Sequence, residues 1–337
     1  MFGSGDRERL ERERRERMAR LRADDGREEE RRGDAAAVAS SSTAASTPTM
    51  TAKARGEKLA AKRRRVDDGD DGDDDELAAL RDMVRRFIDK EIAPHHARWE
   101  REGQVSRELW RHAGELGLLC MGLPTELGGS SAHFGHSAVV VQELARSGFS
   151  GPLFHLHSEI VAPYLHHYGT PEQQQTWLPR MARGEVISAI GMTEPGTGSD
   201  LANISTRATP HDGGYLIKGQ KIFISNGQLA DLVVVAAKTQ PELGARGVSL
   251  LLVDTSRPGF SRGRNLEKMG MHAQDTSELF FDDVWVPANC LLGQEGKGFA
   301  YLMNELPQER LLVAMTAVGA MESGLRWTCE HVQSRKA

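Results

Sequence analysis

Hydrophobic positions divide the chain into regions of different character. Apolar residues are almost missing between Asp6 and Arg32, and between about residues 76 and 185 they recur at spacings of three and four. From residue 186 to about 296 they form short β-branched runs, and a long helical pattern then continues from Gly298 to the end. Spacings of three and four indicate amphipathic helices, whereas short β-branched runs between turns indicate strands.

The helical region is expected to hold four amphipathic helices and a fifth with a clear start signal. The first four contain Leu77–Phe87, Leu109–Leu118, Val139–Leu144 and Ile160–Leu165. The first is expected to end near Pro94, because proline rarely continues a helix. Thr170-Pro171-Glu172-Gln173 is a capping box with proline at the first helical position, and its helix should run to about Gly184. Such helices joined by short loops predict an antiparallel bundle.

The β-branched runs predict six strands with turn signals between them. The expected strands are Val186–Ile190, Tyr215–Lys218, Lys221–Ser225, Leu232–Ala236, Val248–Val253 and Leu279–Val286. Gly213-Gly214, Gly219-Gln220 and Asn226-Gly227 are the turn signals. Because no helical stretch separates these runs, we expect an antiparallel sheet or small barrel rather than a doubly wound parallel sheet. The predicted fold class is α+β, with an N-terminal helical bundle, a central antiparallel β domain and the start of an incomplete C-terminal helical bundle.

These regions predict a domain order of charged tail (1–75), helical domain (76–185), β domain (186–296) and first helix of a C-terminal helical domain (297–337). The tail alternates Arg with Glu and has no apolar surface to offset its ordering entropy, so we expect disorder. Its basic run Lys62–Arg65 fits a nuclear address or a nucleic-acid contact, but the acidic run Asp67–Glu76 favours a solvated linker. A mis-assigned start site is an alternative origin. No secretory signal is present, and the many acids argue against a mitochondrial presequence.

Composition adds limits. The net charge of −5 over 337 residues gives no argument for nucleic-acid or membrane binding. No apolar run approaches the ~20 residues of a membrane-spanning helix. Three cysteines, far apart, fit a reducing compartment. The adjacent pairs His95-His96 and His166-His167 lack the spacing of a two-ligand metal site, so no metal is expected.

Two stretches of the β region carry candidate binding chemistry. Met192–Asp200 follows a predicted strand and gathers two glycines, a proline and three hydroxyls. Gly198 would let a planar or anionic ligand approach the backbone closely, although an ordinary glycine-rich turn has the same composition. In Lys221–Gly227 an aromatic residue precedes a hydroxyl, which suits stacking on a flat ring system. A strand buried on both faces would have the same pattern.

The last helical segment carries a candidate base. Pro307 is expected to kink the helix, and Glu309 lies just beyond it among apolar residues. Apolar surroundings disfavour a charged carboxylate, which suits a general base. The alternative is an exposed glutamate paired with Arg310 or Lys297.

Together these stretches resemble the acyl-CoA dehydrogenase family, and its long-chain branch most closely. The resemblance runs from about Glu76 to the end of the chain. It is carried by Tyr168–Gln173, Met192–Asp200, Gly219–Gly227, Met269–His272 with Asp282–Pro287, and Leu306–Leu312.

The resemblance implies FAD held between the domains. Met192 and Thr193 would contact the flavin, and Gly198 and Ser199 would line the cofactor and the thioester of the substrate. A further set would cover the other side of the flavin: Phe223, Ile224 and Ser225. The family's catalytic base falls on Glu309, and Arg310 would place the substrate or the carboxylate. Arg335 matches an arginine that reaches the FAD phosphates of a neighbouring subunit.

The activity that the resemblance implies is oxidation of medium- or long-chain acyl-CoA to trans-2-enoyl-CoA, with electron-transferring flavoprotein as acceptor. It also implies a homo-oligomer, a dimer or tetramer, in the full-length form. The location would be the cytoplasm of a bacterium or, alternatively, the mitochondrial matrix. Because family members continue beyond the position of Ala337, the alternative is a truncated, non-catalytic paralogue that binds acyl-CoA or a partner.

Overall fold

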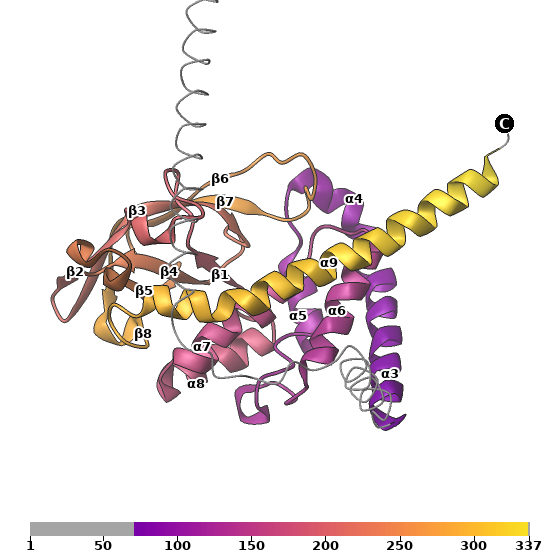
Figure 1. Ribbon diagram of the computed structural model, residues 1–337, viewed down its shortest axis with the longest axis horizontal. Helices are drawn as coiled ribbons and strands as arrows, with labels where there is room; N and C mark the ends of the chain where they lie inside the picture. The colour runs from indigo at the N-terminus through magenta and orange to yellow at the C-terminus, as the bar shows by residue number, and fades with distance from the viewer. Residues whose placement is uncertain (1–70, 336–337) are drawn as a thin grey trace, which may run out of the picture. The chain divides into compact units, whose positions relative to one another are not determined.

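The computed structural model describes residues 71–335, and most of the predicted charged tail therefore lies outside the described residues (Figure 1). The first described helix, α3, begins at Asp71, so residues 71–75, which we had assigned to the tail, are helical. Among residues 71–335, no helix combines the length and apolar character that crossing a lipid bilayer requires.

The region before the sheet is helical, as the apolar spacing predicts. Its helices are α3 (Asp71–Phe87), the π-helix η2 (Ile88–Ile92), α4 (Ala93–Glu102), α5 (Arg107–Glu115), α6 (Phe134–Ser147), the π-helix η4 (Leu156–Val161), α7 (Ala162–Tyr168) and α8 (Pro171–Ala182). The capping box of α8 is confirmed, because Thr170 and Gln173 exchange both of its hydrogen bonds. Pro94 does not end a helix as expected. It lies in the first turn of α4, where proline is tolerated because the missing N–H would have no partner.

The sheet has eight strands in the order β6-β7-β3-β2-β4-β5-β8, with β1 paired to β4. They are β1 (Ser188–Gly191), β2 (Arg207–His211), β3 (Gly214–Ser225), β4 (Leu232–Lys238), β5 (Val248–Asp254), β6 (Phe260–Asn265), β7 (Thr276–Pro287) and β8 (Leu291–Leu292). The predicted α+β class is confirmed, but the sheet is mixed, because β4 pairs in parallel with β1 and with the start of β2. A parallel pair needs a long crossover, usually a helix. Here the β2–β3 hairpin makes that connection, so no helical pattern signalled it.

Strand β3 corrects another expectation. Gly219-Gln220 is not a turn between two strands, because β3 continues through it with a shift in register against β7. Gly219 has φ +153°, and a Cβ there would lie 2.4 Å from Thr206 Oγ1, so only glycine fits. The strands that the sequence missed, β2, β6 and β8, are polar and largely exposed or very short, and therefore lack a strong apolar alternation.

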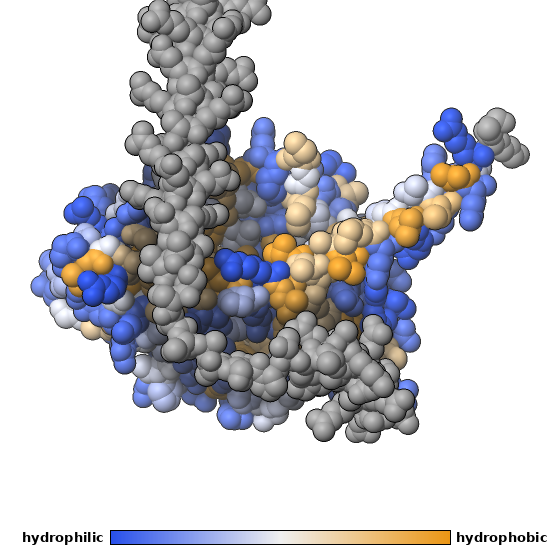
Figure 2. Space-filling model, viewed as in Figure 1, coloured by the Kyte–Doolittle hydropathy of each residue, from blue (hydrophilic) through white to orange (hydrophobic). Residues whose placement is uncertain are grey.

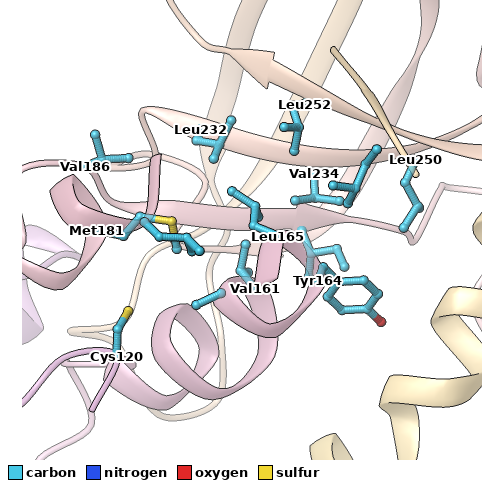
Figure 3. Close-up of a cluster of buried hydrophobic side chains, with 14 of the residues drawn as sticks. Cys120, Val161, Tyr164, Leu165, Met181, Val186, Leu232, Val234, Leu250 and Leu252 are labelled. Carbon is cyan, nitrogen blue, oxygen red and sulfur yellow. The ribbon is translucent and has the colours of Figure 1, made fainter. Parts of the chain in front are cut away.

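The buried strand β4 shows how the sheet joins two cores. One face of β4 packs toward η4, α7 and α8, where Leu232 and Val234 meet Val161, Leu165 and Met181 (Figure 3). The other face packs Val233, Val235 and Ala237 against β3, β5 and β7. Burying each such side chain contributes about 1.5–3 kcal/mol, so β4 is held from both sides.

The chain then enters α9 (Gly298–Ser334), a 37-residue helix. It begins beside the sheet, crosses the helical region and extends past it (Figure 1). Pro307 lies inside α9 without ending it. Proline has no N–H to bond the carbonyl of Met303, but Met303 and Pro307 are both exposed to solvent. Apolar side chains gather along the exposed surface of α9 (Figure 2). The most exposed are Leu311, Val313, Met321, Leu325 and Val332.

Candidate active site

The predicted base, Glu309, is half-buried on α9 and faces α7. The hydroxyl of Tyr164 donates to Glu309 Oε1 at 2.9 Å. Figure 3 shows this tyrosine in the apolar cluster with its hydroxyl pointing toward the yellow ribbon of α9. Among the ion pairs of residues 71–335, none involves Glu309, so the alternative pairing with Arg310 or Lys297 is not seen.

The surroundings of Glu309 favour its neutral form. Burial raises the pKa of Glu309 above its ordinary value, and the negative charge of Glu305 adds to the rise. The hydrogen bond from Tyr164 and the charge of Arg310 act in the opposite direction. A carboxyl group with a raised pKa can hold a proton that it has taken from a weak carbon acid, as a general base must.

A second carboxylate lies one helical turn earlier. Glu305 is 9% exposed and accepts hydrogen bonds from the Tyr168 hydroxyl at 2.7 Å and from His167 Nδ1 at 3.0 Å. Tyr164 on α7 therefore faces Glu309 on α9, and Tyr168 faces Glu305. The two tyrosines are four residues apart on α7, and the two glutamates are four residues apart on α9. Neither tyrosine was predicted as a site residue, although their spacing of four places both on one face of a helix.

The turn Met192–Asp200 and strand β3 lie together, joined by a buried ion pair. Lys221 Nζ lies 2.8 Å from Glu194 Oε1 and donates to the Met192 carbonyl at 3.1 Å. Glu194 also accepts from the backbone N–H groups of Ser205 and Thr206. Burial lowers the pKa of Lys221 to about 8, against the pull of Glu194, so the pair remains ionic at neutral pH. Neither Glu194 nor Lys221 was predicted as a site residue.

The residues predicted to contact flavin differ in exposure. Met192 and Thr193 are half-buried, whereas Gly198 and Ser199 are exposed. A Cβ added at Gly198 would meet no atom within 4 Å, so the space beside this backbone is open.

On β3, the three predicted residues point in different directions. Phe223 is 64% exposed, and its φ of +61° is rare for an aromatic residue. Ile224 is 2% exposed, so it can reach a ligand only through its main chain. The Ser225 hydroxyl accepts a hydrogen bond from Gln274 Nε2 at 2.9 Å. The left-handed Phe223 falls where the pairing of β3 with β7 shifts, and strained residues of this kind cluster at functional sites.

The two predicted arginines lie far apart along α9. Arg310 is exposed and follows Glu309 directly. Arg335 caps the end of α9 and is exposed. At a rise of 1.5 Å per residue, it lies roughly 40 Å along the helix from Glu309. The structure therefore does not bring Arg335 near the other predicted residues.

One histidine of each adjacent pair, His96 and His167, contacts a protein group. His96 Nε2 accepts the backbone N–H of Ser150 at 3.1 Å, and His167 contacts Glu305. Within residues 71–335, no three His, Cys, Asp or Glu side chains gather as a metal site would require.

The fold and site define an α+β protein in which a helical region packs on a mixed sheet and a long C-terminal helix carries a half-buried carboxylate. Three domain models of one protein family match successive parts of this chain. The acyl-CoA dehydrogenase N-terminal domain matches residues 74–185, the middle domain 189–284 and the C-terminal domain 296–337. The chain belongs to the acyl-CoA dehydrogenase family.

Individual relatives agree. The chain is 50% identical over 259 residues to the mitochondrial long-chain specific acyl-CoA dehydrogenase of Mus musculus, covering 76% of this chain and 60% of that protein. A solved acyl-CoA dehydrogenase from Geobacillus kaustophilus is 51% identical with a TM-score of 0.76, over 78% of this chain and 70% of that one. A glutaryl-CoA dehydrogenase from Mycobacterium smegmatis, solved with FADH2, is 31% identical with a TM-score of 0.71, over 78% and 66%. The chain spans about 60% of the length of the curated long-chain relatives it matches.

Proposed function

We propose that this chain carries the catalytic parts of an FAD-dependent acyl-CoA dehydrogenase that oxidises medium- or long-chain acyl-CoA to trans-2-enoyl-CoA. The observation that carries the proposal is the environment of Glu309. Its carboxyl group is half-buried, accepts a hydrogen bond from the hydroxyl of Tyr164, and has a pKa that burial raises. Family membership and the long-chain relatives support the same reading.

Several residues fit FAD. The exposed ring of Phe223 offers an aromatic face, and Gly198 leaves its backbone open to close approach. Met192 and Thr193 lie on the turn that the Lys221–Glu194 pair fixes to β3. We assign Met192, Thr193, Gly198, Ser199, Phe223, Ile224 and Ser225 to the flavin site, Ile224 through its main chain, and Arg335 to the FAD phosphates of a second subunit. When bound, FAD supplies the hydride acceptor.

Glu309 would remove the proton from the carbon next to the thioester. Such a carbon acid is weak, so the base needs the raised pKa that burial provides. Tyr164 donates to one carboxylate oxygen and leaves the other free to receive the proton. Ser199 would line the thioester end of the substrate, and Arg310 would help to place the substrate or the carboxylate.

A Glu309→Gln variant tests this proposal. It should retain flavin and bind thioester, but bleach flavin absorbance at least ~100-fold more slowly, the usual loss on removing a general base. Glu330→Gln, which changes an exposed glutamate on the same helix, should leave the rate unchanged. Turnover of Glu309→Gln at the parent rate would exclude Glu309 as the base.

A second candidate is an acyl-CoA-binding or partner-binding paralogue without catalysis. The exposed apolar side chains of α9 favour it, since such a surface is typical of an interaction site. Stable flavin-free oligomers that bind acyl-CoA without oxidising it would support this candidate.

The remaining assignments are also proposals. We propose three domains that divide near residues 185 and 296, supported by the change from helices to strands and back. The proposed electron acceptor is electron-transferring flavoprotein, and the proposed full-length assembly is a dimer or tetramer. Relatives include mitochondrial and bacterial proteins. The proposed compartment is accordingly the bacterial cytoplasm or the mitochondrial matrix.

A further inference from the structure

A cavity of about 180 Å³ lies between η4, α7 and α9. At about 30 Å³ per water molecule, this is the volume of roughly six waters. Its wall is partly apolar, with Leu123, Phe134 and Pro163, and partly polar, with Ser137, Glu159 and Gln308. Neither lysine nor arginine lines it, but His166 and His167 of α7 do.

The cavity is next to the proposed base. Gln308 precedes Glu309 on α9, and Pro163 precedes Tyr164 on α7, so neighbours of the hydrogen-bonded pair form part of the wall. The side chain of Gln308 donates to the Glu159 carbonyl at 3.1 Å and ties α9 to η4 here. The cavity therefore adjoins the site proposed for the acyl chain, and the length of the chain decides whether its far end enters the cavity.

Glu159 is the unusual group in the wall. The Ser137 hydroxyl donates to Glu159 Oε1 at 2.7 Å, and no ion pair among residues 71–335 includes Glu159. A void of only about 10 Å³, lined by Val140 and Phe154, shares Ser137, Ser158 and Glu159 with the cavity, so these three residues separate the two spaces. Glu159 also lies on a π-helix, a geometry frequent at functional sites.

The chemistry of this wall narrows the ligand. Burial raises the pKa of Glu159, and the hydrogen bond from Ser137 opposes part of this rise. A carboxyl group accepts a hydrogen bond from a hydroxyl group in either protonation state, and it also donates one when it is protonated. An anionic chain end would find no lysine or arginine, burial disfavours the charged form of His166, and His167 is already paired with Glu305. A cationic chain end would require an ionised Glu159 among apolar side chains.

We propose that this cavity receives the far end of an acyl chain bearing a terminal hydroxyl group, and that Glu159 selects for that hydroxyl. This inference rests on the proposed function, because it assumes that an acyl thioester occupies the site beside Glu309. A plain methyl end fills the apolar part of the cavity but leaves the Glu159 carboxyl group without a second partner.

Isothermal titration calorimetry with ω-hydroxyacyl-CoA and plain acyl-CoA thioesters, from hexanoyl to hexadecanoyl, tests it. At the chain length that reaches the cavity, the parent chain should bind the ω-hydroxy thioester about tenfold more tightly, the scale of one hydrogen bond. Glu159→Leu should lose this preference, so that the two thioesters bind with equal affinity. Glu159→Gln, whose amide also donates and accepts, should retain it.

The control is Glu115→Leu, at an exposed position on α5, which should keep the parent preference. Equal affinities for both thioesters at every chain length, with plain acyl-CoA bound and oxidised, would overturn this inference alone. A preference that persists in Glu159→Leu would also overturn it. If neither thioester binds, the proposed function fails and this inference fails with it.

Discussion

At the scale of single residues, Tyr164 and Glu305 act on Glu309 in opposite directions. The Tyr164 hydroxyl lowers the pKa of Glu309, whereas the charge of Glu305 raises it. Because the base must be ionised to accept a proton, the rate of flavin reduction should rise with pH through the pKa of Glu309.

Tyr164→Phe should therefore move the acid limb of the pH–rate profile to higher pH, and Glu305→Gln should move it to lower pH. The measurement is flavin bleaching by a saturated acyl-CoA across a pH series. Tyr215→Phe, on β3 away from the site, serves as control and should not move the limb. Shifts of the same sign in both variants would contradict this account.

The geometry of this residue pair also explains why Glu309 was predicted as a site residue and Tyr164 was not. Local spacing made Glu309 a candidate, because it follows Pro307 on an apolar helix, and the family resemblance gave it the role of base. Its partner is 145 residues away in sequence and meets it only because α7 packs against α9. Glu159 is similar, since its cavity combines η4 with a residue of α9.

At the scale of elements, the Lys221–Glu194 pair fixes the turn after β1 to strand β3. Both side chains are almost completely buried, so removing one leaves the other charge without compensation. Lys221→Met should lower the free energy of unfolding by about 3 kcal/mol and weaken flavin retention.

Urea unfolding and the bound flavin per chain measure the two effects. Lys218→Met is the matched control, because Lys218 is an exposed lysine on the same strand and pairs with exposed Asp283. Lys218→Met should change the free energy of unfolding by no more than about 0.5 kcal/mol. If Lys221→Met unfolds at the same urea concentration as Lys218→Met, the pair does not have this role.

At the scale of the whole described region, Glu143 connects three helices. It accepts hydrogen bonds from Arg81 and Arg85 of α3 and from Arg146, its neighbour on α6. Arg146 in turn bonds Glu322 of α9 at 2.5 Å. Burial alone would raise the pKa of Glu143, but the three arginines outweigh it and hold that pKa below its ordinary value.

Glu143→Gln should lower the free energy of unfolding by about 2–4 kcal/mol. The loss is smaller than for a fully buried network, because the arginines are partly exposed. A carboxyl group whose pKa is lowered by folding stabilises the protein at every pH above its pKa in the unfolded state, which is near 4.3. This stabilisation disappears as the pH falls through the pKa of the folded state. The parent should therefore lose its advantage over Glu143→Gln in acid. Thermal unfolding across pH measures this, with exposed Glu330→Gln as control. A constant difference between parent and variant at all pH values would contradict it.

The sequence by itself determined the features that depend on neighbours along the chain. Apolar spacing predicted the helices, and Thr170 with Gln173 marked the start of α8, because a helix cap is made within four residues. The run Leu232–Ala236 predicted a strand, which is β4. The motifs around Met192, Phe223 and Glu309 predicted the family.

Only the tertiary structure decided the contacts between distant segments. It made the sheet mixed, because a β2–β3 hairpin rather than a helix connects the parallel pair β1 and β4. It placed Lys221 on Glu194, Tyr164 on Glu309 and Ser137 on Glu159. Local periodicity records which face of an element is buried, but the partner on that face depends on how the elements pack, and no single segment encodes that packing.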